Sequence, residues 1–267
     1  MKVGQLPDRL KKGLASRRSR GRIRRIAGEV SRHAPSSGQA VVFFNASTRI
    51  TGLSQNAAFS LLASWGLRLS GARVVHFVCE QGMSRCVLGL NRSDYSQPPP
   101  CKDCVAQSRR LYAGSEIHPF HYHEDQQLAA RLEGLSVTEM GLLEHPAPFP
   151  AAEALPLGRM VLPSIRWTLR RHHLPDDEPT RFLMRTYLLS AYAIARAFAR
   201  LLQDLRPAAA VIFNGILYPE AVARWVARQL NVPNYAHEVG FQAFSTFFTA
   251  GEPTAYPIAI PAESMTM

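Results

Sequence analysis

The chain has 267 residues, 46% of them hydrophobic, so it can bury a substantial core as one large domain or two small ones. No apolar stretch reaches the roughly 18 residues that a membrane-spanning helix needs, because the best candidate, residues 187–195, lies between Arg185 and Arg196. The N-terminal segment is basic but lacks the apolar stretch of a secretory signal. We therefore expect a cytoplasmic protein without a transmembrane helix.

The formal charge of +11 is concentrated at the N-terminus. Residues 1–33 contain eleven Lys and Arg against Asp8 and Glu29, a net charge of +9, which leaves +2 for residues 34–267. We therefore expect residues 1–36 to form a basic N-terminal extension. This extension is either a solvated tail or a segment attracted to anionic lipid headgroups. Nucleic acid is the least favoured partner, because no aromatic residues that would stack on bases accompany the charge.

The first elements of the globular domain follow a turn-rich segment at 33–38. Residues 41–45 are apolar, short and rich in β-branched and aromatic types, which predicts a buried parallel strand. Residues 54–70 predict a helix, with Ser54 placed to cap it and Gly71 ending it. A second strand is predicted at 73–78. The order strand, helix, strand makes a right-handed βαβ unit the default.

The rest of the chain also consists of predicted helices and strands. Short helices are predicted near 104–112 and 123–133, a helix interrupted by Pro163 at 157–174, and a long helix at 179–206 with one continuous apolar stripe. Residues 208–214 predict a third strand, 219–230 a helix and 234–238 another strand. The pattern predicts an α/β fold: a Rossmann-like parallel sheet flanked by helices at 37–250, followed by an irregular C-terminal tail at 251–267.

Four cysteines form the strongest local signal: Cys79, Cys86, Cys101 and Cys104, all within 26 residues and in an insertion at 79–104. A Cys-x2-Cys pair at a tight turn holds one ion between two thiolates, and a second pair completes a tetrahedral shell. Ligand type and number favour zinc. An iron–sulfur cluster also takes four cysteines, and four unligated thiols are the remaining alternative.

A zinc ion with four protein ligands has no open position, so we expect a structural site. It would brace the loop after the second predicted strand. The histidines of His118-Pro-Phe-His-Tyr-His123 match no zinc motif, and we expect them to be half-buried or exposed.

Polar residues follow three of the predicted strands. Asn45 is followed by Ser47 and Thr48, Asn214-Gly215 follows the third confident strand, and Glu238 lies in the last one. Parallel strands bind ligands in the crevice outside their carboxyl ends, and glycine lets the backbone approach a ligand closely. We therefore expect a substrate site there. The alternative is that Asn214-Gly215 is only a turn and Glu238 a surface charge.

Several short motifs resemble the N-terminal half of bacterial glycosyltransferase-like proteins of capsule and surface-polysaccharide biosynthesis. They are Phe213-Asn-Gly215, a helix and then Asn231-Val-Pro-Asn-Tyr-Ala-His-Glu238; Leu157-Gly-Arg-Met-Val-Leu-Pro-Ser164; the long helix before Arg206-Pro207; and the cysteine-rich segment. The similarity spans residues 40–250. Such enzymes are similar to two-domain GT-B transferases, whose N-terminal domain holds the acceptor and whose C-terminal domain holds the nucleotide-sugar donor.

The resemblance implies an acceptor-side domain for a sugar or lipid-linked acceptor, with Glu238 as a general base or an orienting group. The chain stops at Met267, so we expect the nucleotide sugar to be bound by a missing C-terminal domain or by a partner chain. The basic segment at 1–33 would hold the protein at the inner face of the cell membrane. The competing hypothesis is a non-catalytic, zinc-stabilised Rossmann-like binding module.

Overall fold

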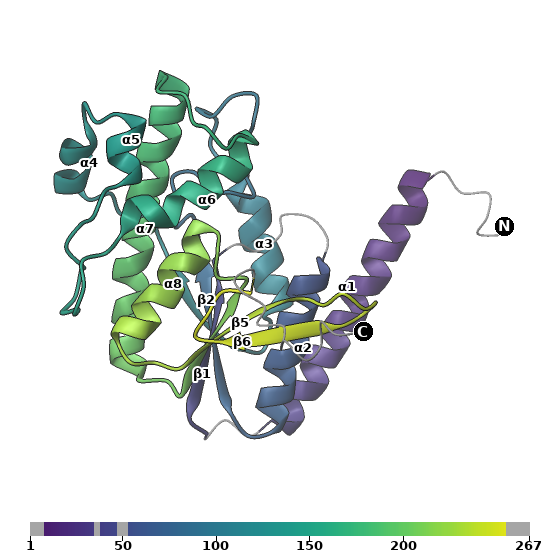
Figure 1. The fold of residues 1–267 in the computed structure, drawn as a ribbon. Coiled ribbons are helices and arrows are strands. Elements are labelled where there is room, and N and C mark those ends of the chain that lie inside the picture. The colour runs from purple at the N-terminus through teal and green to yellow at the C-terminus, as the bar shows by residue number, and fades with distance from the viewer. Residues whose placement is uncertain (1–7, 35–37, 47–52, 255–267) are drawn as a thin grey trace, which may run out of the picture.

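The computed structural model describes residues 8–34, 38–46 and 53–254 (Figure 1). Six strands form one sheet in the order β3-β2-β1-β4-β5-β6. They are β1 (Ala40–Asn45), β2 (Arg73–Cys79), β3 (Glu116–Phe120), β4 (Ala209–Phe213), β5 (Asn234–Val239) and β6 (Thr246–Ala250). The first five are parallel, and β6 runs antiparallel to β5. This arrangement confirms the predicted α/β class and is consistent with a Rossmann-like fold.

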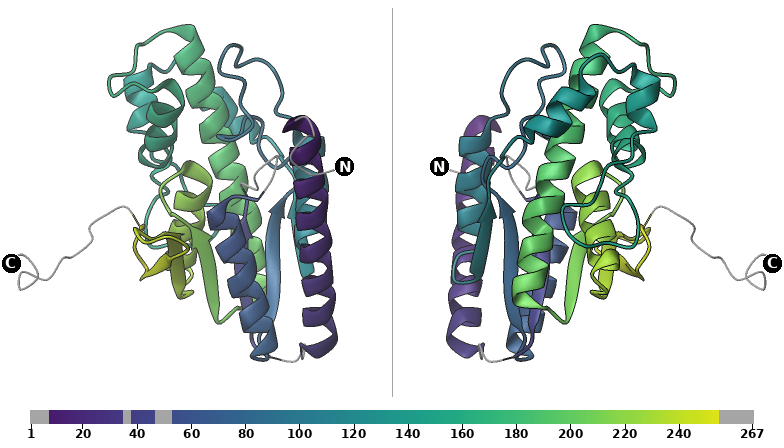
Figure 2. Two further views of the ribbon diagram at one scale, coloured as in Figure 1. Left: turned by 90° about the vertical axis from the view of Figure 1, so that its right-hand side faces the viewer. Right: turned by 90° about the vertical axis from the view of Figure 1, so that its left-hand side faces the viewer.

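Helices cover both faces of the sheet (Figure 2). They are α1 (Asp8–His33), α2 (Gln55–Leu69), α3 (Cys101–Leu111), α4 (Gln126–Leu132), α5 (Val137–Gly141), α6 (Leu157–Leu169), α7 (Glu178–Leu205) and α8 (Tyr218–Gln229). The main core lies between the sheet and α6, α7 and α8, and a smaller cluster joins α1, α2 and α3. No helix in the described ranges is long and apolar enough to cross a membrane.

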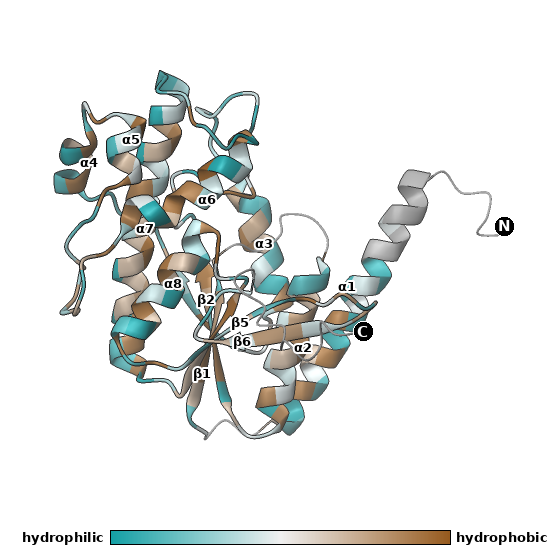
Figure 3. Cartoon of the chain, viewed as in Figure 1, coloured by the Kyte–Doolittle hydropathy of each residue, from teal (hydrophilic) through white to brown (hydrophobic). Residues whose placement is uncertain are grey.

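The main core is built from the apolar stripe of α7 and one face of the strands. Bands of hydrophobic residues recur along α7 (Figure 3). Phe198 of α7 lies between two strand residues, with its ring centroid 5.1 Å from those of Phe44 and Phe77. The stripe at steps of three and four therefore marks core packing, as predicted. Pro163 is accommodated within α6, so the predicted interruption does not end that helix.

The basic N-terminal segment differs from the separate extension that the sequence predicts. Residues 8–33 form α1, whose end packs on α2 and α3. Ala27 and Val30 are buried there in one cluster with Leu61 and Trp65. Contacts with α2 and α3 decide this, because in the sequence the many charges of the segment hide its few apolar residues. The helix is part of the folded domain at this end and projects away from it at the other (Figure 1).

Three further elements were not expected from the sequence: β3, β6 and the short helix α5. Strand β3 contains His118 and Pro119 and is an outermost strand of the sheet. A proline, which has no N–H group, is tolerated in such a strand. His118, His121 and His123 are exposed, in agreement with the expectation for this cluster.

Candidate functional site

Strands β1, β2, β4 and β5 end at one edge of the sheet, because all four are parallel. This is the edge at which open α/β sheets bind ligands. Two groups of side chains lie along it. One surrounds the carboxylate of Glu238, and the other consists of the four cysteines.

The Glu238 carboxylate is held by two asparagines from distant parts of the chain. Asn214, just after β4, donates from Nδ2 to Oε2 over 2.9 Å, and Asn56, in the first turn of α2, donates from Nδ2 to Oε1 over 2.5 Å. The backbone N–H of Val239 also donates to Oε1, over 2.9 Å. The predicted meeting of Asn214 and Glu238 is thus confirmed. These hydrogen bonds fix the orientation of a half-buried carboxylate at the edge of the sheet.

Asn56 was missed by the sequence reasoning. It lies 182 positions before Glu238, and nothing in the local pattern distinguishes it from any other polar residue near a helix start. A usable signal is the position of Ser54, which caps α2 through a hydrogen bond from the N–H of Ala57. The cap fixes where the helix begins and so which side chains of its first turn reach the edge of the sheet.

Asn214 and Gly215 form the turn that follows β4. Both have positive φ, 58° and 79°, a conformation that glycine and asparagine tolerate best. The Asn214 Oδ1 accepts a hydrogen bond from the N–H of Ile216 over 3.1 Å. The predicted turn is therefore present, and the Asn214 side chain both stabilises it and binds Glu238.

The end of the described chain also packs on this turn. Thr254 is buried, and its N–H and Oγ1 donate to the carbonyl of Asn214 over 3.0 and 3.2 Å. A Cβ on Gly215 would lie 3.3 Å from Pro253. The predicted irregular tail from residue 251 therefore begins as a packed segment, because a carbonyl at the edge of the sheet binds it; residues 255–267 lie outside the described part.

The predicted substrate residues at the end of β1 and just after it have a different outcome. The amide of Asn45 contacts Nδ1 of His76 over 2.9 Å, and His76 is fully buried beneath Tyr112, with ring centroids 4.2 Å apart. Burial, with a contribution from the nearby Arg68 charge, lowers the pKa of His76 to about 3. The ring is therefore neutral at physiological pH. Ser47 and Thr48 lie outside the described residues.

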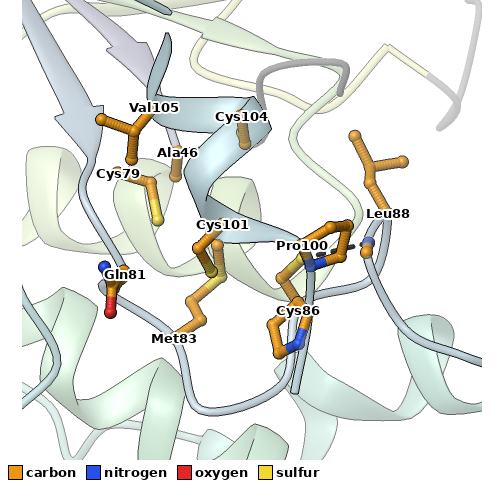
Figure 4. A pocket seen from close by; sticks show the side chains of 12 residues that line it. Ala46, Cys79, Gln81, Met83, Cys86, Leu88, Pro100, Cys101, Cys104 and Val105 are labelled. Carbon is orange, nitrogen blue, oxygen red and sulfur yellow. Dashed lines mark hydrogen bonds between the residues drawn. The ribbon is translucent and has the colours of Figure 1, made fainter. Parts of the chain in front are cut away.

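The four cysteines line one cavity of about 30 Å³ (Figure 4). Cys79 ends β2, Cys86 lies in the following loop, and Cys101 and Cys104 belong to the first turn of α3. Their predicted convergence on one place is therefore observed, and none forms a disulfide. In the described ranges, however, no three His, Cys, Asp or Glu side chains are grouped as a ready site for a metal ion. The zinc ion stays a prediction.

Two glycines donate hydrogen bonds to the sulfurs of Cys79 and Cys86. The N–H of Gly82 donates to Sγ of Cys79 over 3.2 Å, and the N–H of Gly89 donates to Sγ of Cys86 over 3.0 Å. A Cβ on Gly82 would lie 2.1 Å from the Phe120 ring, and one on Gly89 would lie 2.8 Å from Sγ of Cys86. The sequence carries this signal as Cys-x-x-Gly, which occurs twice in succession. Such N–H groups stabilise sulfur atoms that carry negative charge.

Burial controls the protonation of the cysteines when no cation is bound. It raises the pKa of Cys79 to about 12 and that of Cys104 to about 11, and it raises the pKa values of Cys86 and Cys101 as well. For Cys79 and Cys104, charge on the neighbouring thiols adds to the effect. Without a bound cation the four groups are neutral thiols, whereas coordination to a metal removes their protons.

The cysteine loop, residues 80–100 between β2 and α3, is held in place by α7 and α8. The N–H of Ser84 donates to Oγ of Ser190 in α7 over 3.1 Å, and the hydroxyl of Tyr218 in α8 donates to the carbonyl of Arg85 over 2.8 Å. The Arg85 guanidinium in turn donates to the carbonyl of Tyr95 over 2.6 Å. The loop is therefore fixed to the main core before any ligand binds.

Neither the models of known protein families nor the curated proteins include one that matches this chain. Its function is therefore inferred from the fold, from the two groups of side chains at the edge of the sheet and from the motifs of the sequence.

Proposed function

We propose that the chain is the acceptor-side domain of a glycosyltransferase-like protein that builds capsule or surface polysaccharide. The observation that carries this proposal is the Glu238 carboxylate, held by Asn56 and Asn214 at the carboxyl edge of a mostly parallel sheet. Carboxylates and amides at such an edge form hydrogen bonds with the hydroxyl groups of a sugar. The resemblance of the motifs around Asn214 and Glu238 to this family supports the same assignment.

The hydrogen bonds around Glu238 suit it to hold an acceptor hydroxyl. Oε1 accepts two hydrogen bonds from the protein and Oε2 accepts one, from Asn214, among the residues described. A carboxylate has about four acceptor positions, so Oε2 retains one for a hydroxyl. Glu238 would orient that hydroxyl or take its proton as a general base. The donor nucleotide sugar would be bound by another domain or by a partner chain.

The arginines of α1 support a location at the cytoplasmic face of the membrane. Six of them are exposed on the part of the helix before its buried end: Arg17, Arg18, Arg20, Arg22, Arg24 and Arg25. Each basic residue near an anionic surface contributes about 1 kcal/mol of binding free energy. This helix would bring the domain close to lipid-linked acceptors.

A second candidate is a non-catalytic binding module, stabilised by a metal. The observation that favours it is that Glu238 accepts hydrogen bonds from α2, from β5 itself and from the turn after β4. The carboxylate would then connect these three segments and take no part in ligand binding. The two candidates differ in whether a change at Glu238 alters the binding of a sugar.

Saturation-transfer NMR with the full chain tests the proposed role. The probes are the methyl glycosides of glucose, galactose and N-acetylglucosamine, measured with wild type, Glu238→Gln and Glu238→Asp. A hydrogen bond to a charged group contributes about 1.5–3 kcal/mol, so we expect at least about tenfold weaker binding of the bound glycoside in both variants.

Glu252→Gln is the matched control, because Glu252 is an exposed carboxylate on the segment that packs beside Asn214, paired with Arg224 over 3.6 Å. This variant should bind as wild type does. Circular dichroism establishes that each variant is folded. Absence of transfer to every glycoside, or equal transfer in wild type and the folded Glu238 variants, would contradict the proposal.

A further inference from the structure

The turn between β5 and β6, residues 240–245 and here called the aromatic turn, projects two phenylalanine side chains from the domain. Neither the turn nor β6 contains a charged residue. Phe241 is 95% exposed and Phe244 is 88% exposed, whereas the next most exposed large apolar side chain of the described residues, Leu142, is 68% exposed. Single exposed apolar residues are common, but aromatic residues gathered at one projecting turn indicate a site of interaction.

Hydrogen bonds hold the aromatic turn in this conformation. The N–H of Gly240 donates to the carbonyl of Ser245 over 2.8 Å. The N–H and Oγ of Ser245 both donate to the carbonyl of Gln242, over 3.2 and 2.8 Å. Phe244 has a positive φ of 57°, which is uncommon for a residue with a bulky side chain. A backbone held in such a conformation while the ring stays exposed is typical of a functional contact.

The aromatic turn lies on the same side of the domain as α1. Helix α2 contacts both α1 and β5. In Figure 1 the turn and α1 both lie on the right, and the left view of Figure 2, which faces that side, shows α2 between them. Because α1 buries Ala27 and Val30 against the domain, its exposed arginines are on the outside. The arginines and the two phenylalanines can therefore contact one extended surface together.

An anionic lipid bilayer fits these two features better than a protein partner does. Two phenylalanine side chains bury about 300–500 Å², less than the roughly 800 Å² that each partner contributes to a stable protein interface. Insertion into a bilayer has no such minimum area, because binding strength increases with the apolar area inserted. Arginines on the same side attract the anionic headgroups. Two such signals together give stable attachment where one alone is marginal.

We propose that Phe241 and Phe244 insert into an anionic bilayer while the arginines of α1 bind its headgroups. This inference rests on the membrane location in the proposed function and does not depend on sugar binding. Phe241 lies three residues after Glu238, at most about 11 Å along the chain. Insertion of the aromatic turn holds that carboxylate close to the bilayer surface, where a lipid-linked acceptor would present its hydroxyl groups.

Flotation of the full chain with vesicles of phosphatidylcholine and phosphatidylserine tests the proposal. Full burial of one phenylalanine raises affinity at least about tenfold, so Phe241→Ser combined with Phe244→Ser should weaken vesicle binding about 100-fold. Leu142→Ser is the matched control, because it removes an exposed apolar side chain elsewhere on the domain, and it should bind as wild type does. Unchanged flotation of the folded Phe241→Ser and Phe244→Ser variant would overturn the proposal. Weaker flotation of variants in the α1 arginines would then still support the membrane location.

Insertion itself is measured by quenching of tryptophan fluorescence with vesicles whose acyl chains carry bromine. Phe241→Trp should be quenched more than wild type on binding, whereas Leu142→Trp should be quenched no more than wild type. Sedimentation velocity of the same variants detects self-association. Absence of additional quenching in Phe241→Trp would overturn the proposal. Conversion of a dimer to a monomer in the Phe241→Ser and Phe244→Ser variant, with unchanged flotation, would assign the aromatic turn to a contact between copies and overturn it as well.

Discussion

Acid should destabilise the fold through His76, a buried imidazole in the second strand of the sheet. His76 is fully buried between Phe43 and Tyr112, and burial lowers its pKa to about 3. In the unfolded chain a histidine has a pKa of about 6.5. The unfolded state therefore binds the proton more readily between these two values, and the stability that His76 contributes is lost as the pH falls from about 6.5 toward about 3.

The magnitude follows from this difference. A pH of about 5 is about 1.5 units below the pKa of the unfolded histidine. Protonation therefore stabilises the unfolded state and lowers the free energy of unfolding by about 2 kcal/mol. His237 is also buried, and burial lowers its pKa to about 4, so it adds a similar cost. We expect the free energy of unfolding of the wild-type protein to fall by about 4 kcal/mol between about pH 7 and about pH 5 through these two residues.

The assay is urea unfolding at several pH values for wild type and His76→Asn. Asparagine keeps an acceptor near Nδ1, the atom that contacts Asn45, but does not titrate. The variant loses the stacked ring and is less stable at every pH. The relevant quantity is therefore the change in the free energy of unfolding with pH between about pH 7 and about pH 5, which should fall by about half. His173→Asn, at an exposed histidine, should keep the wild-type slope. An unchanged slope in His76→Asn would refute the reasoning.

Two further predictions concern α1 and the cysteine loop. Replacing three exposed arginines of α1 by glutamine should weaken flotation with phosphatidylserine vesicles about 100-fold, at about 1 kcal/mol for each charge, and unchanged flotation would exclude α1 as the membrane contact. The three are Arg18, Arg22 and Arg25. Gly82→Ala should lower the free energy of unfolding by about 1–3 kcal/mol, because its Cβ would lie 2.1 Å from the buried Phe120 ring. Gly28→Ala, with no atom within 4 Å of its Cβ, should be neutral or slightly stabilising. Both variants are measured by urea unfolding, and equal losses of stability in the two would contradict the steric argument.

The cysteine site shows how far local sequence leads. The spacing of four cysteines in 26 residues is visible in the sequence and predicts a common site, because residues so close in the chain readily fold around one centre. How the four side chains meet depends on the packing of α3 against the loop that Ser190 and Tyr218 anchor, which no spacing in the sequence encodes.

The sequence by itself determined the parallel sheet, the long buried helix α7 and the position of Asn214 and Glu238 at one edge. These features follow from hydrophobic periodicity and from the geometry of parallel strands, both of which are local in the chain or common to all folds of the class. Only the tertiary structure decided that Asn56 joins Glu238, that α1 packs on the domain, and that β6 adds an antiparallel edge. Each of these depends on contacts between segments far apart in sequence, whose energies become decisive only when the core has brought the segments together.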